Sequence, residues 1–140
     1  MDEEINKACK ILKDGGIIIF PTDTAFGIGC RIDDGKAVER LFKIRKRPEN
    51  QAVSTLVSSR EMCLMYLENI QPDVQTKLMD RYWPGALTII LPAKAAKVPS
   101  LVRGNGKTLG VRMPDHPTIL NIIKCVGVPI LGSSANFHGG

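Results

Sequence analysis

The stretch IIIFPTDTAFGIGC, residues 17–30, decides the fold of this chain. It begins with a wholly apolar, β-branched run at residues 17–20, and a short run of this kind predicts a strand buried on both faces. Pro21 closes the strand, and a loop with two hydroxyls and a carboxylate follows. Ligands of open α/β sheets bind where loops leave the strand ends, so this loop is the first candidate site.

Helical and strand-like segments alternate along the rest of the chain. Apolar residues recur at helical spacing, with matching start and stop signals, in segments 3–13, 36–45, 60–67, 73–82 and 117–126. Further short apolar strands are predicted at 52–57, 87–91, 109–113 and 128–131. The segment 92–107, with its lysines, prolines and glycines, is predicted to be a mobile surface connection. This alternation predicts an α/β domain with an open mixed sheet.

Length and composition limit the class of protein. The chain has 140 residues, of which 44% are hydrophobic and 24% charged, and these values are typical of one globular domain. No apolar stretch approaches the ~20 residues that span a bilayer. The acidic start of the chain lacks the order of a secretory signal, so we predict a cytoplasmic protein without membrane association. The formal net charge of +5 favours anionic partners such as nucleotides or RNA.

The cysteines and histidines give no sign of a metal or redox site. The four cysteines, at positions 9, 30, 63 and 125, include no C-x-x-C pair, and the chain has two histidines. We therefore expect reduced cysteines and no structural metal.

The first candidate segment is the loop after the strand at 17–20. It carries Thr22, Asp23 and Thr24, and Gly27 and Gly29 permit close approach of the backbone to a ligand. A proline-initiated turn with an Asx-type bond from Asp23 explains the same residues without a ligand.

The second candidate segment is a cluster of four cations in residues 43–47, at the end of a predicted helix. Cations there interact favourably with the helix dipole, so capping and phosphate binding both explain the cluster. Pro48 fixes the chain direction directly afterwards. The guanidinium groups of Arg45 and Arg47 suit phosphate and carboxylate oxygens bidentately.

The third candidate segment combines Arg112, on an apolar strand, with the loop GSSAN at 132–136. A buried guanidinium needs an anion, which is either a bound carboxylate or the nearby Asp115. The hydroxyls and the amide of the loop suit a polar ligand or an ordinary turn. Without a Ser-His-Asp set or paired carboxylates, the three segments favour catalysis by orientation and charge stabilisation on anionic substrates.

These motifs, in this order, resemble the YrdC-like family of threonylcarbamoyl-AMP synthases. The similar segments are IIIFPTDTAFGIGC, RKRPENQAV, RYWPGALTIILPA, TLGVRMPDHP and PILGSSANFHGG. The resemblance implies one YrdC/RibB-like domain over residues 1–140 with an open twisted mixed sheet. It also implies a nucleotidyltransferase that makes L-threonylcarbamoyladenylate from L-threonine, bicarbonate and ATP with Mg²⁺. A threonylcarbamoyl transferase complex would then modify the tRNA adenosine next to the anticodon.

The resemblance further implies roles for individual residues. The side chains expected to contact threonine are Thr22, Ser54, Arg112 and Ser134. Those expected to contact ATP are Arg45, Thr108 and Asn136. The family's K-x-R pair falls on Arg45 and Arg47, which are the expected catalytic residues because they would stabilise the developing negative charge. No residue is assigned as a metal ligand or as a general base.

The chain departs from the family pattern at three places. Arg45 stands where the family usually has lysine, and Gln51-Ala52 stands where it usually has Lys-Pro. The family domain normally continues into a further helix and strand beyond the end of this sequence, so we expect a C-terminally truncated domain. Two alternative functions remain. The chain could be a basic module that binds double-stranded RNA or tRNA without full catalytic activity, or it could be a relative of the carbamoyltransferases. An aromatic content of 5% and a small size give these alternatives little support.

Overall fold

The computed structural model describes residues 3–45, 53–68, 70–104 and 106–134, and the strands in these ranges form two sheets. The first sheet has the order β1-β2-β7 and is antiparallel; its strands are β1 (Ile18–Pro21), β2 (Phe26–Gly29) and β7 (Ser133–Ser134). The second sheet has the order β4-β5-β3-β6. It consists of β4 (Ile89–Pro92), β5 (Thr108–Arg112), β3 (Thr55–Leu56) and β6 (Ile130–Leu131). Only β3 and β5 are parallel among these described strands, so the second sheet is mixed.

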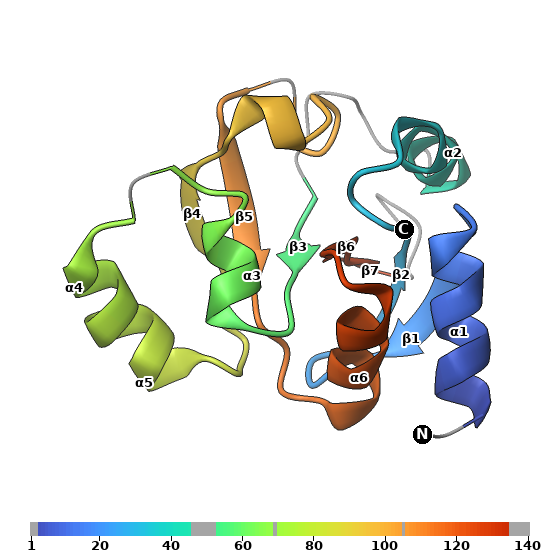
Figure 1. Ribbon diagram of the computed structural model, residues 1–140, viewed down its shortest axis with the longest axis horizontal. Coiled ribbons are helices and arrows are strands. Elements are labelled where there is room, and N and C mark those ends of the chain that lie inside the picture. The colour runs from blue at the N-terminus through green and yellow to red at the C-terminus, as the bar shows by residue number, and fades with distance from the viewer. Residues whose placement is uncertain (1–2, 46–52, 69, 105, 135–140) are drawn as a thin grey trace.

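The predicted α/β class with a mixed sheet is confirmed, although the strands divide between two sheets. A bridge between Arg31 and Ile130 joins the segment after β2 to β6. The two sheets are therefore joined through the continuation of β2, the central strand of the first sheet, and β2 and β6 lie near each other in the middle of the molecule (Figure 1).

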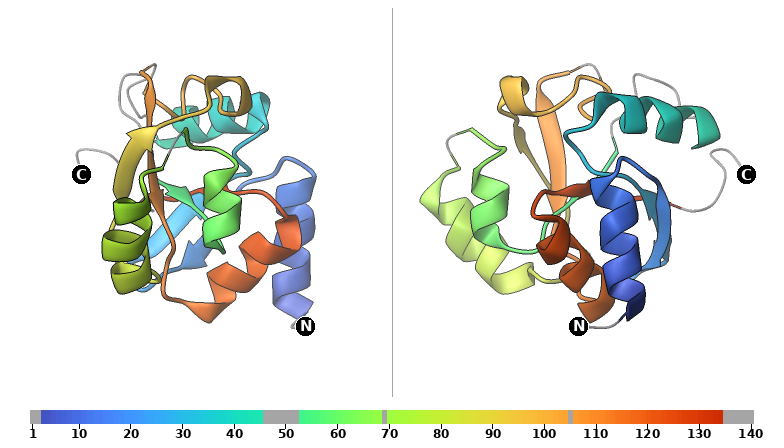
Figure 2. Two further views of the ribbon diagram at one scale, coloured as in Figure 1. Left: turned by 60° about the vertical axis from the view of Figure 1, so that its left-hand side comes forward. Right: turned by 45° about the vertical axis from the view of Figure 1, so that its right-hand side comes forward.

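The helices surround the two sheets (Figure 2). They are α1 (Glu3–Lys13), α2 (Gly35–Arg45), α3 (Arg60–Leu64), α4 (Pro72–Val74), η1 (Gln75–Met79), α5 (Asp80–Tyr82), η2 (Ala95–Lys97) and α6 (Pro117–Val126). The segments α4, η1 and α5 follow one another without a break, with π-type geometry in the middle. All five predicted helical segments are confirmed, and α1 and α6 lie side by side against β1.

Helix α6 shows how local sequence sets an element. His116 caps its first turn by accepting a hydrogen bond from the Thr118 amide, and Pro117 takes the first helical position, where it loses no bond. Gly127 ends the helix with φ +85°, a conformation that favours glycine. The chain then turns directly into β6.

One strand prediction is wrong in its burial: residues 17–20 were expected to be buried on both faces, but Ile19 in β1 is 66% exposed. In β4, Ile90 is 68% exposed. Each strand lies at the edge of its sheet and has one face covered, so burial alternates along it. Most described residues of the segment 92–107 are exposed or half-buried, as expected of a surface connection, but Val98 and Val102 are buried in the core.

The expectation of four reduced cysteines is corrected by a disulfide between Cys9 of α1 and Cys125 of α6. The two Cα atoms lie 6.0 Å apart, although 116 residues separate them in sequence. Local spacing such as C-x-x-C carries no information on a pair this distant. Cys30 and Cys63 are free thiols in the core, and burial raises the pKa of each to about 12.

We expect reduction of the Cys9–Cys125 disulfide to lower the free energy of unfolding by about 2 to 4 kcal/mol, because the bond closes a long loop in the unfolded chain. Thermal unfolding with and without a phosphine reductant measures this change. A Cys9→Ser variant should unfold at the lower temperature in both conditions. Titration of the unreduced protein in denaturant should find the two thiols of Cys30 and Cys63, and four thiols would contradict the bond.

Among the described residues, no helix has the length and apolar character needed to cross a bilayer.

Candidate functional site

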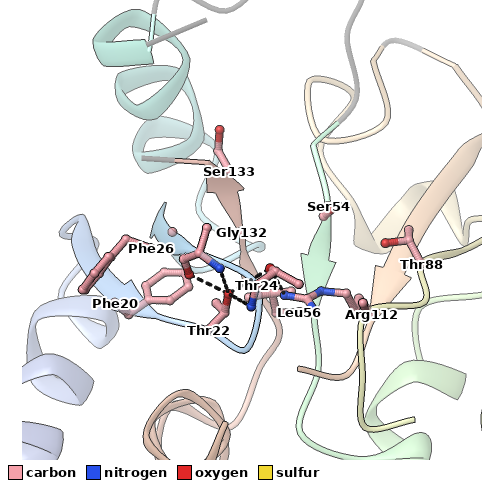
Figure 3. Close-up of a pocket in the computed structure, with 13 residues that line it drawn as sticks. Phe20, Thr22, Thr24, Phe26, Ser54, Leu56, Thr88, Arg112, Gly132 and Ser133 are labelled. Atoms are coloured by element: carbon pink, nitrogen blue, oxygen red, sulfur yellow. Dashed lines mark hydrogen bonds between the residues drawn. The ribbon is translucent and has the colours of Figure 1, made fainter. Parts of the chain in front are cut away.

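A cavity of about 280 Å³ opens between the two sheets (Figure 3). The β1–β2 hairpin and β7 contribute one wall, with Phe20, Thr22, Thr24, Phe26 and Ser133. The second sheet and the segments leading into it contribute the opposite wall, with Ser54, Leu56, Thr88 and Arg112. The cavity therefore combines hydroxyl groups and one guanidinium group with apolar surface.

The turn between β1 and β2 is held by the Thr22 hydroxyl. This hydroxyl donates to the Ala25 carbonyl oxygen at 2.6 Å, and it accepts from the amides of Thr24 at 3.2 Å and Ala25 at 3.1 Å. The predicted turn is present, but the side chain that makes it is Thr22 and not Asp23. The Asp23 carboxylate is consequently available for a contact elsewhere.

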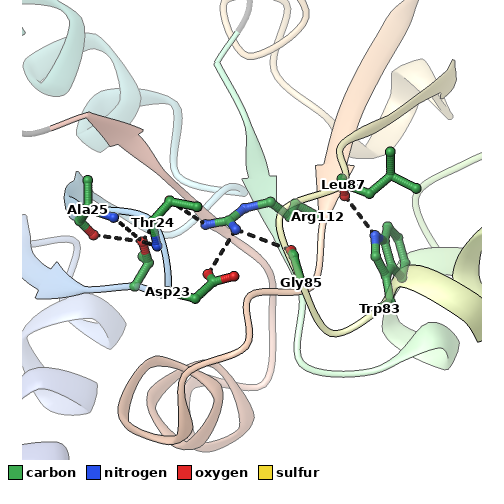
Figure 4. Close-up of polar contacts among 8 residues, drawn as sticks. Asp23, Thr24, Ala25, Trp83, Gly85, Leu87 and Arg112 are labelled. Carbon is green, nitrogen blue, oxygen red and sulfur yellow. Dashed lines mark hydrogen bonds and ion pairs between the residues drawn. The ribbon is translucent and has the colours of Figure 1, made fainter.

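Arg112 lies at the end of β5 and points toward this turn (Figure 4). Its Nη1 atom donates to Asp23 Oδ1 at 2.9 Å and to the Gly85 carbonyl at 3.2 Å. Its Nη2 atom donates to the Thr24 hydroxyl at 3.4 Å. The prediction that a buried Arg112 needs an anion is confirmed, whereas Asp115 was the wrong structural partner. Asp23, 89 residues away, supplies the charge.

Both glycines of the hairpin allow close packing; Gly27 also lines the cavity, whereas Gly29 does not. A Cβ atom on Gly27 would lie 2.7 Å from the ring of Phe20, and one on Gly29 would lie 1.8 Å from the carbonyl oxygen of Leu131. Gly29 thus allows the first sheet to approach β6 closely. Gly27 lies over the buried Phe20 ring, which contributes to the apolar part of the cavity.

The structure brings together three of the four residues expected to contact threonine. Thr22, Ser54 and Arg112 all line the cavity. Ser134 belongs to β7, whose preceding residue Ser133 also lines it. The Ser134 side chain is outside the part of the structure that is described, so its expected contact with threonine stays a prediction.

The residues expected at ATP do not gather around this cavity. Arg45 is the last residue of α2 and is 4% exposed, and Thr108 begins β5 at the end opposite Arg112. Neither residue lines the cavity. Arg47 and Asn136 lie outside the described residues. The phosphate-binding part of the predicted site therefore stays a prediction.

Sequence reasoning included Asp23 and Thr24 in the first candidate segment without a role of their own, and it missed Thr88. Thr24 and Thr88 line the cavity, whereas Asp23 contacts Arg112. Thr88 lies within the strand predicted at 87–91, and the contact of Asp23 with Arg112 joins distant segments, so no local pattern indicated the role of either residue.

The cavity suits a small anionic or zwitterionic ligand. Its volume is near the low end of ligand pockets, which begin at ~300 Å³. A guanidinium group matches a carboxylate geometrically, and the buried Leu56 and Phe20 side chains offer a surface for a short apolar group. Among the described residues, no group of three or more His, Cys, Asp or Glu side chains gathers as a metal site.

Comparison with protein families and sequences gives consistent matches. The family model of Sua5, YciO and YrdC proteins, described as "Telomere recombination", matches residues 10–140. The threonylcarbamoyl-AMP synthase of Bacillus subtilis strain 168 is 34% identical over 138 residues, which cover 99% of this chain and 40% of that protein. The enzyme of the same name from Aliivibrio fischeri is 33% identical over 138 residues, which cover 98% of this chain and 74% of that protein.

Solved structures agree with these matches. P. abyssi Sua5 complexed with L-threonine superposes with a TM-score of 0.91 at 34% identity, covering 96% of this chain and 39% of that one. E. coli YciO superposes with a TM-score of 0.84 at 30% identity, covering 98% of this chain and 66% of that one. The chain thus spans less than half the length of some relatives and about three quarters of others. The family match over residues 10–140 confirms the resemblance that the motifs indicated, and the chain belongs to the Sua5/YciO/YrdC family.

Proposed function

We propose that this chain forms the threonine-binding and adenylate-forming domain of a threonylcarbamoyl-AMP synthase. The observation that carries the proposal is the small cavity lined by Arg112, whose guanidinium group is held by Asp23 and Thr24. An amino acid carboxylate pairs with such a group in a charge-assisted, bidentate way. The solved P. abyssi relative with L-threonine supports the choice of amino acid.

Threonine would enter with its carboxylate on Arg112 and its short side chain over Leu56, close to the hydroxyls of Thr22 and Ser54. A contact with Ser134 rests on the family resemblance. Its amine attacks bicarbonate, and loss of water leaves a carbamate. A carbamate oxygen then attacks the α-phosphorus of ATP, and pyrophosphate leaves with the electrons of the broken P–O bond. Each step concentrates negative charge, so cationic groups that face the phosphates accelerate it.

The proposed ATP-binding residues are assigned from the positions of the family's motifs in this sequence. Arg45 and Arg47 would contact the phosphates, and Thr108 and Asn136 would contact other parts of the nucleotide. Mg²⁺ would enter bound to the ATP phosphates as part of the substrate. A threonylcarbamoyl transferase complex acting on tRNA would consume the product.

Pyrophosphate release tests this proposal. With ATP, Mg²⁺ and bicarbonate present, we expect release that depends on threonine and is weaker with serine, which lacks the methyl group that would contact Leu56. If the protein binds threonine in calorimetry but releases no pyrophosphate, the threonine site is supported and the missing activity is due to the ATP-binding part. Absence of both, together with salt-dependent binding to tRNA or double-stranded RNA, would contradict the synthase and favour the basic RNA-binding module.

Arg45→Lys tests the phosphate side, because it restores the residue that the family usually has. We expect threonine-dependent pyrophosphate release at an equal or higher rate, since the positive charge remains and the ammonium group is more compact. Steady-state kinetics with varied ATP measure the effect. A loss of tenfold or more would mean that this protein has built its phosphate site around the larger guanidinium group.

A further inference from the structure

We propose that Asp23 is a positioning residue, which fixes the Arg112 guanidinium group in the orientation that receives the substrate carboxylate. The inference rests on the proposed function, because it concerns how the same cavity binds threonine. Its observation is the ion pair between Asp23 Oδ1 and Arg112 Nη1 at 2.9 Å, whose side chains are 19% and 9% exposed.

The contacts of Arg112 select which of its donors face a ligand. A guanidinium group has five N–H donors. Within the part of the chain that the structure describes, Asp23 and the Gly85 carbonyl take both donors of Nη1, and Thr24 takes one of Nη2. The Nε donor and the second Nη2 donor remain, and these two lie side by side on one edge of the group. Such an edge is a bidentate fork for a carboxylate.

Asp23 acts through Arg112 and not on the ligand itself. Arg112 and Thr24 line the cavity, whereas Asp23 is not among the residues that do. Figure 4 shows Asp23 on the side of the guanidinium group that faces the turn. The Thr22 hydroxyl holds this turn, so the backbone that carries Asp23 has a fixed position.

The pair also connects the two sheets. Asp23 follows β1 in the first sheet, and Arg112 ends β5 in the second. A mostly buried pair of this kind is costly to break, because the remaining charge is left without a partner. The orientation of Arg112 is consequently coupled to the relative placement of the two cavity walls.

Charge and orientation make opposite predictions for loss of Asp23. Removing a negative charge beside Arg112 makes the cavity more positive, and charge alone would then strengthen binding of a carboxylate. Loss of orientation weakens binding instead. Threonine affinity in Asp23 variants therefore distinguishes a positioning role from a purely electrostatic one.

The experiment compares Asp23→Ala and Asp23→Asn with the wild-type chain. We expect Asp23→Ala to raise the threonine Kd in calorimetry, and KM in pyrophosphate release, at least tenfold, as loss of a charge-assisted hydrogen bond implies. The value of kcat at saturating threonine should stay within about threefold, since threonine that is bound occupies the same site. Asp23→Asn keeps an oxygen that can accept a hydrogen bond from Arg112 Nη1, so its threonine Kd should lie between those of wild type and Asp23→Ala.

Asp33→Asn is the matched control, because Asp33 also pairs with an arginine, Arg31 at 2.6 Å, but lies outside the cavity. It should leave Kd and KM unchanged. Equal or tighter threonine binding in Asp23→Ala would overturn the inference, and so would a fall in kcat with an unchanged KM. If Asp23→Ala does not fold, Asp23→Asn decides by the same criteria. Wild-type protein that binds no threonine would overturn the proposed function, and the inference with it.

Discussion

Replacing Arg112 with alanine should weaken threonine binding by at least tenfold and up to about 150-fold. A hydrogen bond to a charged group contributes ~1.5–3 kcal/mol, and every ~1.4 kcal/mol is a factor of ten in affinity. Arg112 is the cation that lines the described cavity, and its guanidinium group is held by Asp23, Thr24 and the Gly85 carbonyl. Calorimetric titration with threonine measures the loss.

Two further variants make this result specific to the guanidinium group. Arg112→Lys keeps the positive charge but removes the planar fork, so threonine affinity should fall between wild type and Arg112→Ala. Arg31→Ala removes an arginine that pairs with Asp33 away from the cavity, and its threonine affinity should match wild type. Unchanged threonine affinity in Arg112→Ala would remove this residue from the site.

The helices and the class of the fold could be predicted from the sequence, because helical periodicity extends over several turns. The segment 117–126 is an example, since apolar spacing, Pro117 and Gly127 all indicate the same helix. Strand β2 could not be predicted, because its four residues include two glycines and only Ile28 and the exposed Phe26 carry apolar side chains. Its pairing with β1 and β7 is a tertiary property.

Within the candidate site, Thr22 and Ser54 were expected from the family resemblance, whereas Arg112 was marked by its own chemistry. Arg112 was identified because a cation buried on an apolar strand needs an anionic partner, and in the structure Asp23 is that partner. The identity of the anion was out of reach, because Asp23 lies 89 residues away and Asp115 was nearer. The Cys9–Cys125 disulfide was missed for the same physical reason. Pairings between distant segments depend on how the two sheets meet.

Among glycine-to-alanine replacements at the described glycines, Gly29→Ala should cause the largest loss of stability. A Cβ atom at this position would lie 1.8 Å from the Leu131 carbonyl oxygen and 3.0 Å from its carbon. Both atoms are backbone, and the Leu131 amide is also fixed by donating to the Cys30 carbonyl at 2.9 Å. Overpacking usually costs ~1–3 kcal/mol when side chains can move, so we expect about 4 kcal/mol or more here.

Thermal unfolding of Gly29→Ala should accordingly begin at least ~8 °C below wild type, since 1 kcal/mol corresponds to roughly 2–4 °C for a domain of this size. Gly35→Ala is the matched control, because the added methyl group would meet nothing within 4 Å at the first residue of α2. Alanine favours the helix there, so this variant should unfold at or slightly above the wild-type temperature. A Gly29→Ala protein as stable as Gly35→Ala would mean that β2 and β6 can separate without loss. The two sheets would then not be held at the distance on which the cavity between them depends.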